Sequence, residues 1–251
     1  EELASLYDMS YPERAAKILA KFLTDYTEEE LLADTAAAYA PERFSAAPAP
    51  VTALSDLFIL ELFHGPTCAF KDMALQLMPR LFSRALIKCK EEKTALILTA
   101  TSGDTGKAAL EGYRDIPGVR LQVFYPTDGV STLQKLQMQT QEGKNLSVIA
   151  IRGNFDDAQN GVKAIFSDPA MKAELDKRGV FLSSANSINF GRLAPQIVYY
   201  ISAYCDLVKN GSIAEGEVID VAVPTGNFGN IFAAFLAKKM VASYHIASKL
   251  S

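Results

Sequence analysis

The chain has 251 residues, of which 49% are hydrophobic and 22% charged, and its formal net charge is −4 at pH 7. This length and apolar content predict a compact globular protein with one large core or two modest ones. The acidic balance without a basic block argues against nucleic acid as a partner. No apolar stretch reaches the length of a membrane span, and the first residues lack the pattern of a secretion signal. We therefore expect a cytoplasmic protein that binds neither nucleic acid nor a membrane.

Cysteine and histidine content narrows the chemistry further. The three cysteines, Cys68, Cys89 and Cys205, lack metal-ligand spacing, and we interpret them as buried thiols in a reducing compartment. Two histidines, His64 and His245, cannot build a His-rich metal site, and no metal is predicted. We interpret His64 as a loop residue rather than a catalyst.

The N-terminal segment is predicted to be helical. Helices are expected near 12–24 and 28–39, each after a capping-box pattern, S-x-x-E from Ser10 and T-x-x-E from Thr27. The stretch SAAPAP, residues 45–50, cannot continue a helix through its prolines and should connect this segment to the body.

The body alternates short apolar runs with helical patterns. The candidate strands are 58–63, 94–100, 119–125, 146–151, 180–182 and 218–223. This alternation is typical of an α/β fold with a mostly parallel sheet, in which ligands gather where strands end and helices begin. Three such junctions carry unusual residues.

The first junction is FHGPTCAFKD, which contains Lys71. Apolar spacing across 74–86 predicts a helix that Pro79 kinks or, less readily, ends. Lys71 then falls in the first helical turn, where the helix dipole opposes a charged ammonium. Lys71 could be a nucleophilic amine there. Alternatively, its head lies in water or pairs with Asp72.

The second junction is TATSGDTGKAAL, where a strand ends at Ala100 and residues 101–105 precede a helix. Backbone N–H groups and the helix dipole can hold an anion there. The P-loop interpretation fails, because only two residues separate the glycines and Ala108 follows the lysine. The alternative is an ordinary turn with a Thr or Asp cap.

At the third junction, strand 218–223 runs into PTGNFGN and then into an apolar helix, 231–240. Two glycines allow close approach of a phosphate, and the helix N-terminus supplies donors. The alternative is a Gly-Asn turn that reverses the chain. Two anion sites and one amine, which a parallel sheet would bring to one edge, together indicate pyridoxal 5'-phosphate as cofactor.

Four segments resemble the threonine synthases: FHGPTCAFKD, TATSGDTGKAAL, SANSINFGRLAPQIVYY and PTGNFGNIFAAFLAKKM. They extend the resemblance over most of residues 51–240. The resemblance implies an α/β protein of the fold type II pyridoxal-phosphate enzymes, similar to the tryptophan synthase beta chain. Such a fold has two open α/β domains with a cofactor cleft between them.

The resemblance also implies roles for individual residues. Lys71 would be the catalytic lysine, which forms the Schiff base with the cofactor and moves protons at substrate carbons. The cofactor phosphate would lie on Gly226, Asn227, Phe228, Gly229 and Asn230. The substrate loop would comprise Thr101, Ser102, Gly103, Asp104 and Thr105.

In SANSINFGR, the resemblance places Asn186, Ser187 and Arg192 at the substrate phosphate. Asn186 and Asn189 are also candidates for contacts to the cofactor ring. A phosphate role for Arg192 makes chemical sense, since a guanidinium binds phosphate in bidentate fashion. The alternative is a surface arginine before a helix.

The reaction implied is conversion of O-phospho-L-homoserine and water to L-threonine and phosphate, by a carbon–oxygen lyase of threonine biosynthesis. The expected partner is this small-molecule substrate, and the expected state is a monomer or a homodimer. A serine or threonine dehydratase, a cysteine synthase, or a catalytically silent fragment or binding protein that retains the fold remain alternatives.

The resemblance further predicts a domain layout. A helical segment, 1–50, would precede a larger cofactor-binding domain formed by 51–93 and 183–240, with a smaller domain at 94–182. Residues 241–251 do not resemble the family continuation and form an atypical tail. We expect a truncated chain, which lacks a C-terminal part with the partner of the pyridine nitrogen.

Overall fold

The computed structural model describes residues 2–45, 47–187, 189–225, 227–241 and 244–250. They form two compact units, which are Glu1–Leu77 with Phe190–Ser251 and Met78–Asn189. Each unit is described by itself below. Among the described residues, no helix has the length and apolar character needed to cross a bilayer.

The first unit starts with three helices, η1 (Ala4–Leu6), α1 (Tyr11–Ala20) and α2 (Glu28–Ala38). Both predicted capping boxes are confirmed. The Thr27 hydroxyl accepts from the Glu30 amide at 3.2 Å, and the Glu30 carboxylate accepts from the Thr27 amide at 2.9 Å. Helix α1 ends earlier than predicted, because the Lys21 amide closes a tightened last turn on the Ile18 carbonyl.

The strand predicted at 58–63 forms over its first residues, but its predicted place in a parallel sheet is wrong. Strands β1 (Val51–Leu54) and β2 (Leu57–Leu60) form an antiparallel hairpin in which Leu54 pairs with Leu57. The two residues between them, with Ser55 at a φ of 53°, form a tight turn. The sheet pairing is therefore local.

The helix predicted over 74–86 is two helices. Helix α3 (Asp72–Leu75) lies in the first unit, and α4 (Met78–Lys88) begins the second. Pro79 is the second residue of α4, where its missing N–H costs no intrahelical hydrogen bond. Pro79 therefore neither kinks nor ends the helix that contains it.

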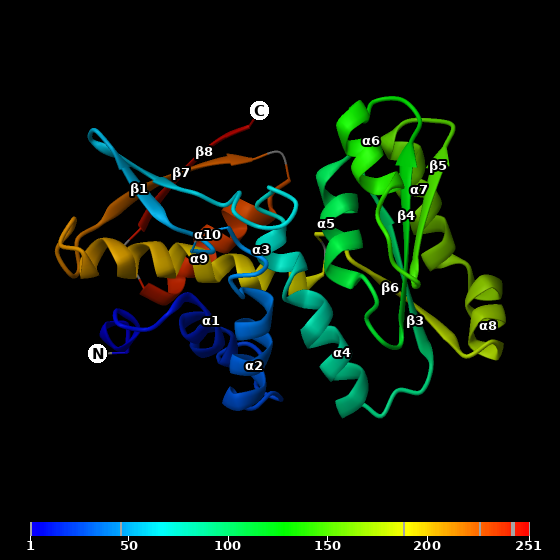
Figure 1. Cartoon of the computed structure of the whole chain (residues 1–251), viewed down its shortest axis with the longest axis horizontal. Helices are drawn as coiled ribbons and strands as arrows, with labels where there is room; N and C mark the ends of the chain where they lie inside the picture. The colour runs from blue at the N-terminus through cyan, green and yellow to red at the C-terminus, as the bar shows by residue number, and fades with distance from the viewer. Residues whose placement is uncertain (1, 46, 188, 226, 242–243, 251) are drawn as a thin grey trace. The chain divides into compact units, whose positions relative to one another are not determined.

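The second unit is built on a four-stranded parallel sheet in the order β5-β4-β3-β6 (Figure 1). The strands are β3 (Thr94–Ala100), β4 (Val119–Pro126), β5 (Leu146–Ile151) and β6 (Val180–Ser184). These four strands confirm the predicted ones, and every pairing is parallel. The predicted α/β architecture is confirmed in this unit.

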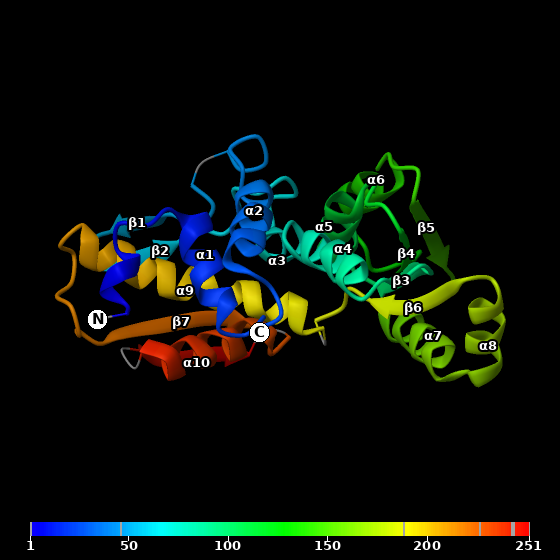
Figure 2. The same ribbon diagram turned by 90° about the horizontal axis from the view of Figure 1, so that it is seen from below.

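Helices cover both faces of this sheet. They are α5 (Asp104–Tyr113), α6 (Thr132–Gln139), α7 (Phe155–Ser167) and α8 (Pro169–Lys177). Leu98 and Ala100 of β3 pack against Ala158 and Val162 of α7. Helix α5 contacts β4, and Figure 2 shows α5 and α7 on opposite faces of the sheet.

Helix α9 (Phe190–Lys209) is the central element of the first unit and contacts α1, α3 and α10 (Gly229–Val241). Strand β7 (Ile219–Thr225) pairs in parallel with β8 (Tyr244–Leu250), so the predicted atypical tail contains a strand. The guanidinium of Arg14, 3% exposed, donates to Leu6 O, Tyr7 O and the Ser202 hydroxyl. This buried arginine joins α1 to α9.

The three junctions were predicted to lie at one edge of a single parallel sheet, and this prediction is wrong. Their strands belong to the β1–β2 hairpin, the four-stranded sheet and the β7–β8 pair. The predicted domain division also places α4 in the larger domain, whereas α4 belongs to the second compact unit. The assignment of functional domains stays a prediction.

Candidate functional site

Lys71 immediately precedes α3, is half-buried, and has a helical backbone with φ −64° and ψ −22°. Its ammonium lies 4.5 Å from the centroid of the Phe70 ring, within the range of a cation–π contact. Helix α3 has only four residues, so its dipole is small. The expectation that a long helix dipole acts on Lys71 is therefore wrong.

The segment before Lys71 is held by Asp72, which is completely buried. One carboxylate oxygen accepts from the Thr67 amide at 2.8 Å and the other from the Thr67 hydroxyl at 2.7 Å. A Cβ at Gly65 would lie 2.6 Å from the Asp72 Cβ, so only glycine fits there. This loop fixes the backbone on both sides of Lys71.

His64 belongs to a separate polar group. Its Nε2 lies 2.6 Å from a Glu61 carboxylate oxygen, and its ring packs on Phe63 at 4.5 Å. The hydrogen bonds from His64 and then from Thr52 lower the pKa of Glu61. The prediction that His64 is a loop residue agrees with its position between β2 and α3.

The predicted cofactor-phosphate loop joins β7 to α10. Gly226 lies outside the described residues. Asn227 and Phe228 are exposed, Phe228 by 68%. Gly229 is the first residue of α10, and a Cβ built on it would meet no atom within 4 Å. Open space therefore adjoins the N-terminus of a 13-residue helix, where N–H groups lack intrahelical partners.

Asn230, the second residue of α10, is bound to α9. Its side-chain oxygen lies 2.5 Å from the Tyr199 hydroxyl and 2.7 Å from the Tyr200 hydroxyl. Burial raises the pKa of both phenols, so both are donors at neutral pH. The two tyrosines thus connect α9 to the start of α10.

The predicted substrate loop of the second unit is organised around Thr101, which is 2% exposed. The Thr101 hydroxyl oxygen accepts from the amides of Gly103 at 3.0 Å and Gly106 at 2.9 Å. This geometry supports a positioning role for the hydroxyl. Its contact with substrate stays a prediction.

The remaining loop residues differ in exposure. Ser102 and Asp104 are exposed, and Thr105 is half-buried. Gly103, with a φ of 152°, caps α5, and a Cβ there would lie 2.4 Å from the Gln134 amide. Gln134 donates to the Asp104 carboxylate at 2.7 Å. Helix α6 therefore supports this loop.

Three predicted residues follow the end of β6. The Asn189 amide group donates to Ser184 O at 3.0 Å, and Ser187 is exposed. The side-chain oxygen of Asn186 is buried and has no hydrogen-bond partner among the described residues. Such an acceptor suits a donor that a ligand would bring.

Arg192 lies in the first turn of α9 and is 3% exposed. The alternative of a surface arginine before a helix is therefore wrong. The backbone carbonyl oxygen of Arg192 accepts a hydrogen bond from the Gln196 side chain at 2.6 Å, and this bond fixes the backbone of the turn.

The structure thus divides the predicted site residues between the units. Lys71, Arg192 and 227–230 lie in the first unit, where α9 contacts both α3 and α10. Residues 101–105 and 186–189 lie in the second.

The sequence did not point to Thr67, Tyr199 and Tyr200 as supporting residues, and it suggested Asp72 only as a partner of the Lys71 ammonium. Thr67 and Asp72 both lie within the segment FHGPTCAFKD, and this proximity could have suggested a buried anchor. The tyrosines are part of the quoted VYY run, but nothing in the run indicates their partner. The prediction of buried thiols is wrong for Cys68 and Cys89, which are exposed, while Cys205 is buried.

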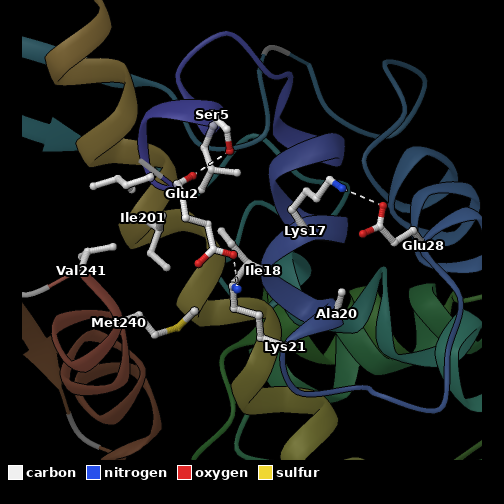
Figure 3. Close-up of a pocket in the computed structure, with 12 residues that line it drawn as sticks. Glu2, Ser5, Lys17, Ile18, Ala20, Lys21, Glu28, Ile201, Met240 and Val241 are labelled. Atoms are coloured by element: carbon white, nitrogen blue, oxygen red, sulfur yellow. Dashed lines mark hydrogen bonds and ion pairs between the residues drawn. The ribbon is translucent and has the colours of Figure 1, made fainter.

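Two cavities of the first unit lie apart from Lys71. One of about 420 Å³ lies between α1, α9 and the end of α10, where Figure 3 shows Glu2 paired with Lys21 and Lys17 with Glu28. None of its described lining residues is a predicted site residue. The other, of about 740 Å³, lies between the hairpin, α9 and β7, and its lining includes Tyr200 and Asn230.

The chain is similar in sequence to known threonine synthases. No model of a known protein family matches the chain. The chain is 43% identical over 248 residues to "Threonine synthase-like 1" of Homo sapiens, covering 95% of this chain and 33% of that protein. It is 42% identical over 245 residues to threonine synthase of Pseudomonas aeruginosa, covering 96% of this chain and 49% of that enzyme.

A solved structure agrees. The crystal structure of pyridoxal-phosphate-bound threonine synthase from Brucella melitensis has a TM-score of 0.83 and 35% identity, covering 98% of this chain and 51% of that one. The chain spans about half the length of the threonine synthases it matches. In sequence and in its fold type II architecture, the chain is similar to the threonine synthases over about half of their length.

Proposed function

We propose that this chain binds pyridoxal phosphate and converts O-phospho-L-homoserine and water to L-threonine and phosphate. The observation that carries the proposal is that one compact unit contains both Lys71 and a helix N-terminus with open space at Gly229. The proposal also includes a cytoplasmic location and a monomer or homodimer.

The residues present fit this cofactor. A phosphate suits the start of α10, because the absence of a side chain at Gly229 leaves room beside N–H groups that have no intrahelical partner. The aldehyde of pyridoxal phosphate forms a Schiff base with a primary amine, which Lys71 supplies. The buried oxygen of Asn186 is suited to accept a hydrogen bond from a bound ring or substrate.

Bound pyridoxal phosphate would supply an electron sink for negative charge at the substrate Cα. Lys71 would carry protons between substrate carbons. Arg192, which stays charged at all relevant pH values, would hold the phosphate that departs. The backbone donors of loop 101–105, whose shape depends on the Thr101 hydroxyl, would receive the substrate carboxylate or that phosphate.

Phosphate release from O-phospho-L-homoserine tests the proposal. We expect release by the chain supplied with pyridoxal phosphate and its loss in Lys71→Ala. Lys172→Ala, which removes an exposed lysine of α8, is the matched control and should keep the rate. Equal rates with L-serine and O-phospho-L-homoserine would argue for a dehydratase instead.

A second candidate is a catalytically silent protein that retains the cofactor site. The similarity to a protein named only threonine synthase-like favours it. Cofactor binding without phosphate release or turnover of serine would support this second candidate against the first.

A further inference from the structure

Two adjacent tyrosines of α9 converge on one atom of α10. Successive residues of a helix point about 100° apart, yet the hydroxyls of Tyr199 and Tyr200 both lie within 2.7 Å of the Asn230 side-chain oxygen. Their ring centroids are 4.7 Å apart with an interplanar angle of 53°. The Tyr199 hydroxyl also lies 3.2 Å from the Gln196 side-chain oxygen, a longer contact than the one with Asn230. Both side chains therefore present their hydroxyls to the same acceptor.

This arrangement fixes the orientation of the Asn230 amide. A carbonyl oxygen has two lone pairs, and two phenol donors can occupy both. The NH₂ group of Asn230 is then directed away from the tyrosine hydroxyls. Because Tyr199 is completely buried, water does not readily replace its hydroxyl, whereas Tyr200 borders the cavity of about 740 Å³ between the hairpin, α9 and β7.

Asn230 follows directly on Gly229, where α10 begins beside open space. A residue in the first turn of a helix determines where the N–H groups of that turn point. Packing of α9 on α10 does not itself require this polar contact, since phenylalanines would fill the same space. The hydroxyls of Tyr199 and Tyr200 therefore position the first turn of α10.

Tyr204 shows how a tyrosine of the same helix is used for structure alone. It is also completely buried, and its hydroxyl accepts from the Gly216 amide at 2.9 Å and donates to Glu217 O at 3.2 Å. Both partners are backbone groups of the connection before β7. Tyr204 is thus a matched control, a buried tyrosine with two hydrogen bonds that do not involve α10.

We infer that Tyr199 and Tyr200 are positioning residues, which hold Asn230 so that the N-terminus of α10 binds the phosphate group of the cofactor. This inference rests on the proposed function.

Binding of pyridoxal phosphate and of pyridoxal, which lacks the phosphate, tests the inference. Both aldehydes can react with Lys71, so their dissociation constants, measured by absorbance titration, separate phosphate recognition from everything else. In Tyr199→Phe and in Tyr200→Phe we expect the constant for pyridoxal phosphate to rise about fivefold, the equivalent of one neutral hydrogen bond. The constant for pyridoxal should change less than about twofold, and in Tyr204→Phe the ratio of the two constants should stay that of the parent chain.

A second measurement addresses the route through Asn230. In an Asn230→Ala background, Tyr200→Phe should cause no further loss of pyridoxal phosphate affinity, because the acceptor is already absent. An unchanged ratio in both phenylalanine variants overturns the inference while leaving the proposed function intact. Absence of pyridoxal phosphate binding by the parent chain overturns both.

Discussion

The carboxylate of Asp72 accepts hydrogen bonds from both the amide and the hydroxyl of Thr67, at 2.8 and 2.7 Å. The residues between the two partners form a closed loop that ends at Lys71, the residue before Asp72. A buried carboxylate with two donors is a rigid anchor. The position of the Lys71 backbone therefore depends on Asp72.

Asp72→Ala tests this anchor. Loss of two charge-assisted hydrogen bonds at a buried site should lower the free energy of unfolding by about 3 kcal/mol, measured by urea titration. Asp72→Asn is the control, because its amide can still accept from the Thr67 amide and donate to the Thr67 oxygen, at a cost of about 1 kcal/mol. Equal losses in the two variants would contradict the account.

Gly65→Ala tests the same loop from its other side. The added Cβ would lie 2.6 Å from the Asp72 Cβ, and we expect a loss of about 1–3 kcal/mol of stability from overpacking. Gly161→Ala is the matched control, since Gly161 lies inside α7 and a Cβ added to it would meet no atom within 4 Å. That substitution should stabilise the chain by up to about 1 kcal/mol, and destabilisation by both would point to a general intolerance of alanine.

Thr101→Val should destabilise the loop before α5. The change keeps the shape but removes the oxygen that accepts from Gly103 and Gly106, at a cost of about 2 kcal/mol. Thr101→Ser keeps that oxygen and should cost less than about 1 kcal/mol. Hydrogen exchange of the Gly103 and Gly106 amides is the direct measurement, and unchanged protection in Thr101→Val would show that the hydroxyl does not hold the loop.

Alkaline pH should destabilise the fold through its buried tyrosines. Burial raises the pKa of Tyr11, Tyr39, Tyr199 and Tyr244 above the ordinary value of 10.0. The unfolded chain then loses protons that the folded chain retains, so the stabilisation is complete below pH 10 and declines as the pH rises further. Each such tyrosine contributes a loss of about 1.4 kcal/mol per pH unit above 10.

Urea titrations on either side of pH 10 measure this effect. Because the chain has no tryptophan, tyrosinate absorbance in the near ultraviolet follows ionisation without interference. Because Tyr11, Tyr39, Tyr199 and Tyr244 are buried, their ionisation should coincide with unfolding rather than precede it. Ionisation of all tyrosines near pH 10 without unfolding would contradict the burial described.

Local signals in the sequence predicted much of the fold. Capping boxes at Ser10 and Thr27 depend on residues three positions apart, and both are confirmed. Strands β3 to β6 were predicted from short apolar runs that alternate with helical patterns, and all four are confirmed. The site residues were predicted from motifs and resemblance.

The sequence could not show which strands share a sheet or which distant side chains meet. The apolar run at 58–63 suits a buried parallel strand as well as the hairpin that forms, since both favour the same residue types. Pro79 is compatible with a kink, a stop or a helix start, and packing decides. The contact between Tyr200 and Asn230 spans 30 positions, and no local pattern encodes it.

The attachment of pyridoxal phosphate to the chain tests the central claim most directly. The chain is incubated with the cofactor, reduced with borohydride to make any covalent bond to an amine permanent, digested, and analysed by peptide mass spectrometry. We predict a stoichiometric label confined to Lys71 and absent from Lys71→Ala, with unlabelled Lys172 as the internal reference. A label spread evenly over exposed lysines, or no label, would contradict the account.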